Sequence, residues 1–86
     1  MKKKKALGRE AMILIKRRKE MGLTQSDVAE HAGISLQHYQ LYEYGTRKVS
    51  SGNMMLGLKI CAALELEPYE FVFENSSDWV RRTRKP

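Results

Sequence analysis

Side chains with catalytic or metal-binding chemistry are few and far apart in this sequence. Its 86 residues include two histidines, His31 and His38, which stand seven residues apart, and one cysteine, Cys61. Neither histidine has the neighbouring thiol nucleophile or carboxylate cluster that catalysis requires. One cysteine cannot form an internal disulfide, and a structural zinc site needs several thiolates or imidazoles at fixed spacing. We therefore expect no enzyme activity, no cofactor and no metal, and we interpret Cys61 as a small buried helix residue.

Basic residues are grouped along the chain. The formal net charge is +6 at pH 7, with basic groups at residues 2–5, 9, 16–19 and 81–85 and four glutamates between residues 65 and 74. A basic chain of this size prefers polyanions, which means nucleic acid or an anionic membrane surface. The basic groups lack an interleaved apolar face, which disfavours membrane binding. The distribution of charge therefore favours a nucleic-acid footprint.

Length and composition predict one globular domain. Apolar residues make up 42% of the chain and charged residues 30%, as in ordinary globular proteins, and the length allows one modest core. No apolar run approaches a membrane span, and Gly8, Arg9 and Glu10 interrupt the basic start before a signal peptide could form. We expect a cytoplasmic protein with a basic N-terminal arm at 1–6, a domain at 7–74 and a C-terminal tail at 75–86.

Apolar residues at helical spacing predict a first helix. Leu7, Ala11, Leu14 and Met21 are separated by about one or two helical turns, which places them on one face. Gly22 follows and suits the left-handed conformation that ends many helices.

Capping signals predict two further short helices in close succession. Thr24 is followed three residues later by Asp27, which is the pattern of a capping box at the start of a second helix. Gly33 ends that helix in a sharp turn, and Ser35 caps a third helix that stops at Gly45. Two short helices are therefore expected to meet across a glycine turn.

The remaining pattern predicts a fourth and a fifth helix. The fourth is expected to be capped near Ser50 or Ser51 and to carry Met54, Leu58, Cys61, Ala62 and Leu64 or Glu65 along successive turns. Pro68 suits the first turn of a short, apolar fifth helix. No strand pattern competes with the helical one.

The motif Leu23-Thr24-Gln25-x-x-Val28-Ala29-x-x-x-Gly33-Ile34-Ser35-x-x-x-Tyr39-x-x-Tyr42-Glu43-x-Gly45 resembles the helix-turn-helix of the phage repressor and Cro family, also called the XRE family. The resemblance covers about residues 7 to 73. It implies an all-α, five-helix, lambda-repressor-like DNA-binding domain with basic N- and C-terminal tails. The sequence departs from the family pattern after Gly45, where about three additional residues stand before Ile60. This predicts either a longer loop or a fourth helix extended by a turn.

The resemblance also implies an ion pair. Family members pair an arginine four residues before the first glycine with the glutamate after the third helix, and these positions are Arg18 and Glu43 here. We expect a partly buried pair with a structural role, because splitting it would strand a charge.

In this family the third helix enters the major groove, so its exposed positions are the candidate base readers. They are Leu36, Gln37, His38, Gln40 and Leu41. Glutamine amides can contact adenine through two hydrogen bonds, and leucine can pack on a thymine methyl group. The alternative interpretation is that some of these residues are merely solvated.

Candidate phosphate contacts flank that helix in the sequence. They are Gln25, Thr46, Arg47, Lys48, Ser51 and Asn53. Gln25 stands at a helix N-terminus, where backbone N–H groups favour an anion, and similar proteins use a glutamine there to brace the reading helix and grip the DNA backbone. The N-terminal lysine run resembles the arm of phage lambda repressor, although this run and the basic C-terminal segment can equally be solubilising ends.

A sequence-specific regulator of double-stranded DNA, in the first place a repressor on a palindromic operator, is the function implied. The family usually binds as a twofold homodimer, and the candidate interface is Tyr69, Phe71, Val72, Phe73, Trp79 and Val80, unless these residues complete the monomer's own core. Activator, antitoxin and restriction-modification controller share the architecture. The alternative to DNA binding is a partner-binding module, such as an antitoxin, whose main contact is a toxin or another protein.

Overall fold

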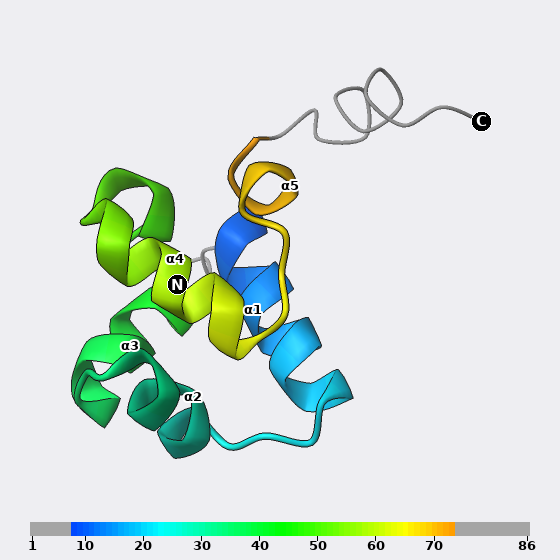
Figure 1. The fold of residues 1–86 in the computed structure, drawn as a ribbon, viewed down its shortest axis with the longest axis vertical. Coiled ribbons are helices and arrows are strands. Elements are labelled where there is room, and N and C mark those ends of the chain that lie inside the picture. The colour runs from blue at the N-terminus through cyan, green and yellow to red at the C-terminus, as the bar shows by residue number, and fades with distance from the viewer. Residues whose placement is uncertain (1–7, 74–86) are drawn as a thin grey trace, which may run out of the picture.

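The computed structural model describes residues 8–73, which form five α-helices and one 3-10 turn. In chain order these are α1 (Arg9–Glu20), α2 (Gln25–Ala32), α3 (Leu36–Glu43), η1 (Val49–Ser51), α4 (Met54–Ala63) and α5 (Pro68–Val72). Figure 1 shows α2 and α3 as neighbours at one end, with α4 crossing the middle and α5 at the other end beside α1. No strand occurs in this range, so the all-α, five-helix expectation is confirmed. None of the five helices is long and apolar enough to cross a bilayer. The expected arm at 1–6 and tail at 75–86 lie outside the described residues.

The first helix and its termination follow the sequence pattern. Ala11 and Leu14 are buried on the inner face of α1. Gly22 adopts φ +71° and donates its N–H to the Lys19 carbonyl at 3.1 Å. This left-handed residue reverses the chain and directs it into α2.

Caps fix the start of both helices of the helix-turn-helix unit. Thr24 Oγ1 accepts the Asp27 N–H at 3.0 Å, while Asp27 Oδ2 accepts the Thr24 N–H at 2.8 Å, which is the expected capping box. Gly33 ends α2 at φ +73°, where a side chain would be strained. Ser35 Oγ then accepts the His38 N–H at 3.1 Å. The relative placement of α2 and α3 therefore depends on local signals in the sequence.

Every helix contributes to one core. Its largest fully buried side chains are Tyr39, Phe71, Leu14, Ile60, Leu64, Glu43 and Val28. Only Glu43 among them is charged. Burial of the aliphatic and aromatic side chains stabilises the domain, and each contributes about 1.5–3 kcal/mol relative to full exposure.

The segment before α4 differs from the expectation. The predicted cap at Ser50 or Ser51 is wrong: both residues lie in η1, and α4 begins after Asn53, whose Oδ1 accepts the Leu56 N–H at 3.0 Å. The additional residues thus form a longer loop, and Val49 anchors it in the core. Two residues of the predicted apolar stripe, Met54 and Leu58, are 77% and 45% exposed, whereas Cys61 and Leu64 are buried.

A cation at the start of α1 holds α5 in place. The guanidinium of Arg9 donates to the Glu70 carbonyl at 2.6 Å and also to the Phe71 carbonyl. These carbonyls belong to the last turn of α5, where backbone acceptors lack partners within the helix. The contact joins the two ends of the described chain.

Candidate nucleic-acid interface

The carboxylate of Glu43 joins the three helices that make up the candidate interface. Arg18 of α1 donates Nε to Oε2 at 2.6 Å and Nη2 to Oε1 at 3.1 Å. Tyr39 donates its hydroxyl to Oε2 at 2.6 Å, and Gln25 of α2 donates Nε2 to Oε1 at 2.9 Å. The side chains of Arg18 and Glu43 are 14% and 1% exposed. The ion pair implied by the resemblance therefore forms, and its carboxylate is fully buried.

Both members of this pair remain charged at neutral pH. Burial by itself raises the pKa of Glu43, but the hydrogen bonds from Arg18, Tyr39 and Gln25 outweigh it and lower the pKa below the ordinary value of 4.5. The hydrogen bond from Glu43 in turn raises the pKa of Arg18. Removal of either partner would leave a buried charge without compensation.

Gln25 connects this carboxylate to the reading helix. Its Nε2 donates to Glu43, and its Oε1 accepts Nε2 of Gln40 at 2.9 Å. Gln25 is also the first residue of α2. The capping box occupies the N–H groups of Thr24 and Asp27, which leaves those of Gln25 and Ser26 to favour an anion. The N-terminus of α2 and one flank of α3 thus form a single braced surface.

The candidate base readers divide into two groups on α3. Leu36, Gln37, Gln40 and Leu41 form two adjacent pairs separated by about one helical turn, and they share a face. Gln37 is exposed, and the other three are half-buried. His38 lies on another side, where its ring stacks on Tyr42 with 5.5 Å between centroids and its Nε2 is 3.2 Å from the tyrosine hydroxyl. The structure therefore brings four of the five candidates together and separates His38 from them.

Apart from Gln25, the candidate phosphate contacts follow α3 in the segment that leads to α4. Thr46, Arg47 and Lys48 are exposed. Ser51 donates its hydroxyl to the Lys48 carbonyl at 3.1 Å, which occupies its proton. Asn53 uses its side-chain oxygen as the α4 cap, so its amide group retains donors for a phosphate. The loop presents two cations and several polar donors beside the reading helix.

Two tyrosines of α3 have features that the sequence interpretation missed. The Tyr39 ring is buried in the core and its hydroxyl hydrogen-bonds to Glu43, a contact for which the spacing of four residues is the available signal. Tyr44, at the C-terminal end of α3, is 58% exposed. Its position seven residues after Gln37, about two turns along the same face, was the corresponding signal.

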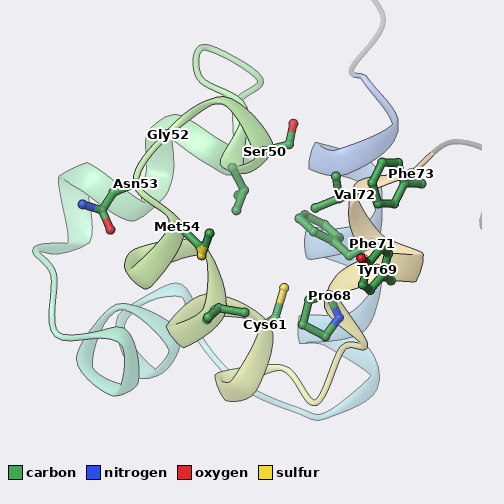
Figure 2. Close-up of a pocket in the computed structure, with 13 residues that line it drawn as sticks. Ser50, Gly52, Asn53, Met54, Cys61, Pro68, Tyr69, Phe71, Val72 and Phe73 are labelled. Carbon is green, nitrogen blue, oxygen red and sulfur yellow. The ribbon is translucent and has the colours of Figure 1, made fainter.

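An apolar groove separates α4 from α5 (Figure 2). Its volume is about 440 Å³, and Met54 and Leu58 on α4 and Tyr69, Val72 and Phe73 in and after α5 line it as exposed apolar side chains. The rings of Tyr69 and Phe73 stack at 5.3 Å.

One residue of the expected dimer interface is buried. Phe71 is only 2% exposed, because it points from α5 into the core, so it is not available to a partner. Tyr69, Val72 and Phe73 are exposed. Trp79 and Val80 lie outside the described residues.

The Cys61 thiol is buried in the core. Burial raises the pKa of the Cys61 thiol to about 11, so it is protonated at neutral pH. In this range no group of three or more histidine, cysteine, aspartate or glutamate side chains is placed to hold a metal ion.

Comparison with known families identifies the same part of the chain. A family model described as Helix-turn-helix matches residues 14–71, which is more than half of the chain. The match begins within α1 and ends within α5, so it includes the Glu43 network, the reading helix and the loop after it. No curated protein and no solved structure matches the chain.

Proposed function

Because the chain belongs to the XRE-type helix-turn-helix family of DNA-binding regulators, we propose that it is a transcriptional repressor that binds a palindromic operator as a homodimer. Helix α3 enters the major groove, which is wide enough for a helix and offers a different donor and acceptor pattern for each base pair. This function uses no catalysis and no cofactor, and it belongs in the cytoplasm.

The observation that carries the proposal is the hydrogen bond of 2.9 Å between Gln25 and Gln40. It joins a helix N-terminus suited to a phosphate with the exposed face of α3. A contact to the DNA backbone and a contact to base edges are therefore held at a fixed distance, which sets the register of the protein on the duplex.

The basic loop supports the same surface. Arg47 and Lys48 are exposed in the segment directly after α3. Their charges contribute affinity through phosphate contacts and counterion release, without selecting a sequence. Choice of sequence rests on Gln37 and Gln40 and on packing by Leu36 and Leu41.

Homodimerisation supplies the remaining affinity. One short helix contacts only a few base pairs, whereas a twofold dimer reads two half-sites about one helical turn apart. The exposed apolar residues of the groove are more than scattered surface residues, since they cluster on two helices. We assign this groove, through Tyr69, Val72 and Phe73, to the dimer interface.

Selection of bound duplexes from a random pool, at near-physiological salt, tests the proposal. A palindrome is expected, and Gln37→Ala is expected to relax the preference at one position of each half-site by about 1–3 kcal/mol. Met12→Ala, a change at an exposed residue of α1, serves as the control and leaves the motif intact. Weak, salt-sensitive binding without any motif would contradict sequence-specific regulation by this chain alone.

The apolar groove also favours a second candidate function, in which the main contact is another protein such as a toxin. Under that function, Gln37→Ala and Gln40→Ala leave the biological activity unchanged, while Phe73→Ala abolishes it. Loss of activity in Gln37→Ala and Gln40→Ala supports the repressor, whatever the effect of Phe73→Ala, because Phe73 also belongs to the proposed dimer interface.

A further inference from the structure

We propose that the buried Glu43 carboxylate fixes the orientation of the Gln40 amide through Gln25, so that Gln40 selects an A·T base pair and rejects a G·C pair in which guanine replaces the contacted adenine. The inference rests on the proposed function, because it takes α3 to lie in the major groove. It gives Glu43 and Gln25 a positioning role in specificity in addition to their structural contacts.

The orientation begins at the carboxylate. An ionised carboxyl group only accepts hydrogen bonds, and Glu43 lies 2.9 Å from Nε2 of Gln25. The reversed Gln25 amide would place its oxygen against the carboxylate oxygen inside the protein, where such repulsion is poorly screened. The NH₂ group of Gln25 therefore faces Glu43, and its oxygen faces the opposite way.

That oxygen determines the next amide. Oε1 of Gln25 only accepts, so Gln40 must turn its own NH₂ group toward it, and the Nε2 to Oε1 distance is 2.9 Å. The bond occupies one N–H of Gln40. Its Oε1 and its second N–H remain available on the half-buried flank of α3.

An acceptor beside one donor matches adenine. In the major groove adenine presents the N6 amino donor next to the N7 acceptor, whereas guanine presents two acceptors, N7 and O6. A freely rotating glutamine can turn its NH₂ group toward guanine. The oriented Gln40 instead places its oxygen near an oxygen or ring nitrogen of guanine, so a G·C pair with guanine at the contacted base is disfavoured.

Gln37 offers an internal comparison on the same helix. It is exposed, and within residues 8–73 no hydrogen bond holds its side chain. The orientation of its amide is set by the DNA it meets. Its base preference is therefore independent of Gln25.

The experiment uses the full chain and the duplex recovered by selection. Gln40→Ala identifies the base pair that Gln40 reads, and binding is then measured to four duplexes that differ only there. The wild-type protein is expected to prefer A·T over G·C by about tenfold. In Gln25→Met the new side chain has a similar length but lacks the amide that relays the orientation. This variant is expected to bind all four duplexes more weakly, and its preference for A·T over G·C is expected to fall to about twofold.

A matched control separates specificity from general damage. At the base pair identified by Gln37→Ala, the preference of Gln25→Met is expected to equal that of the wild-type protein. A merely structural role of Gln25 lowers affinity for every duplex and leaves both preferences intact.

Three results overturn the inference while the proposed function stands: a preference for G·C at the Gln40 position, an unchanged preference in Gln25→Met, or no position relaxed by Gln40→Ala. The wild-type preference is measured without any change at Gln25, so a preference for G·C overturns the inference even if that variant is unstable. Failure to recover any motif with the wild-type protein overturns both the proposed function and this inference.

Discussion

At the scale of single residues, the Glu43 carboxylate accepts four hydrogen bonds, two from Arg18 and one each from Tyr39 and Gln25. Hydrogen bonds to a charged group contribute more than neutral ones. Each donor also satisfies a lone pair that burial would otherwise leave without a partner. The stability of the domain should therefore respond strongly to changes around this one group.

Tyr39→Phe is expected to reduce the free energy of unfolding by about 2 kcal/mol, because it removes a buried donor to an ionised acceptor. Tyr42→Phe is the matched control in the same helix: its hydroxyl lies 3.2 Å from Nε2 of the neutral partner His38 rather than beside a carboxylate, and the expected loss is about 0.5 kcal/mol. Urea unfolding of both variants provides the measurement. An equal loss in the two variants would show that the Tyr39 hydroxyl has no special contribution.

The lowered pKa of Glu43 predicts a loss of stability in acid. Because the folded state holds the carboxylate below its ordinary pKa of 4.5, the contribution is complete above that pH and disappears as the pH falls through the folded value. The double variant Arg18→Met, Glu43→Gln removes the pair without stranding a charge. Urea unfolding between pH 7 and pH 3 should show a smaller acid-induced loss for the double variant than for the wild-type protein. Parallel pH profiles would refute this assignment.

At the scale of elements, the helix caps differ in how well local sequence defines them. Thr24 and Ser35 stand directly before apolar helical patterns and between glycines, so α2 and α3 could be predicted with their boundaries. Before α4, by contrast, Ser50, Ser51 and Asn53 are all able to cap a helix. Local propensity does not choose among them.

Tertiary contacts make that choice. Val49 is buried, and a Cβ atom at Gly57 would lie 3.3 Å from its Cγ1, so the loop and α4 approach each other closely. This packing fixes the path of the loop and delays the start of α4 to Met54. Tertiary packing also decides that Phe71 is buried. A helix of five residues is too short for a periodic pattern to reveal which face turns inward, so the sequence could not predict this burial. The Tyr39 hydroxyl was missed because a buried tyrosine reads simply as an apolar residue.

The corrected cap is itself testable. Asn53→Ala is expected to reduce the free energy of unfolding by about 1 kcal/mol, since it removes the acceptor for the Leu56 N–H. Ser50→Ala is the control: this exposed residue lies in η1, and its change should stay within about 0.5 kcal/mol. Thermal and urea unfolding distinguish the two. A larger loss in Ser50→Ala would restore the boundary that the sequence pattern suggested.

At the scale of the whole molecule, the net charge of +6 and the exposed loop with Arg47 and Lys48 predict DNA binding whose affinity depends strongly on salt. Arg47→Ala should weaken binding to all duplexes about equally and reduce the slope of log K against log salt by about 1. Lys16→Ala removes a charge that already pairs with Glu20 on α1, and its slope should change less. Titrations between low and physiological salt give both slopes. A change of sequence preference in Arg47→Ala would instead make Arg47 a base reader.

The groove between α4 and α5 is the proposed dimer interface, and changing it tests whether the protein is a dimer in solution. Phe73→Asp places a carboxylate where a twofold partner would bury an aromatic ring that is half exposed in the monomer, and desolvation of that charge opposes association. Met12→Asp introduces the same charge at an exposed apolar residue that does not line the groove, so it controls for the electrostatic effect on DNA binding. Sedimentation equilibrium should show a dimer for the wild-type protein and for Met12→Asp, and a monomer for Phe73→Asp. On the palindrome, Phe73→Asp should lose the affinity gained from joining two half-sites, while its affinity for a single half-site matches that of Met12→Asp. A dimeric Phe73→Asp protein would move the interface away from this groove, and a monomeric wild-type protein would leave the groove to a different partner.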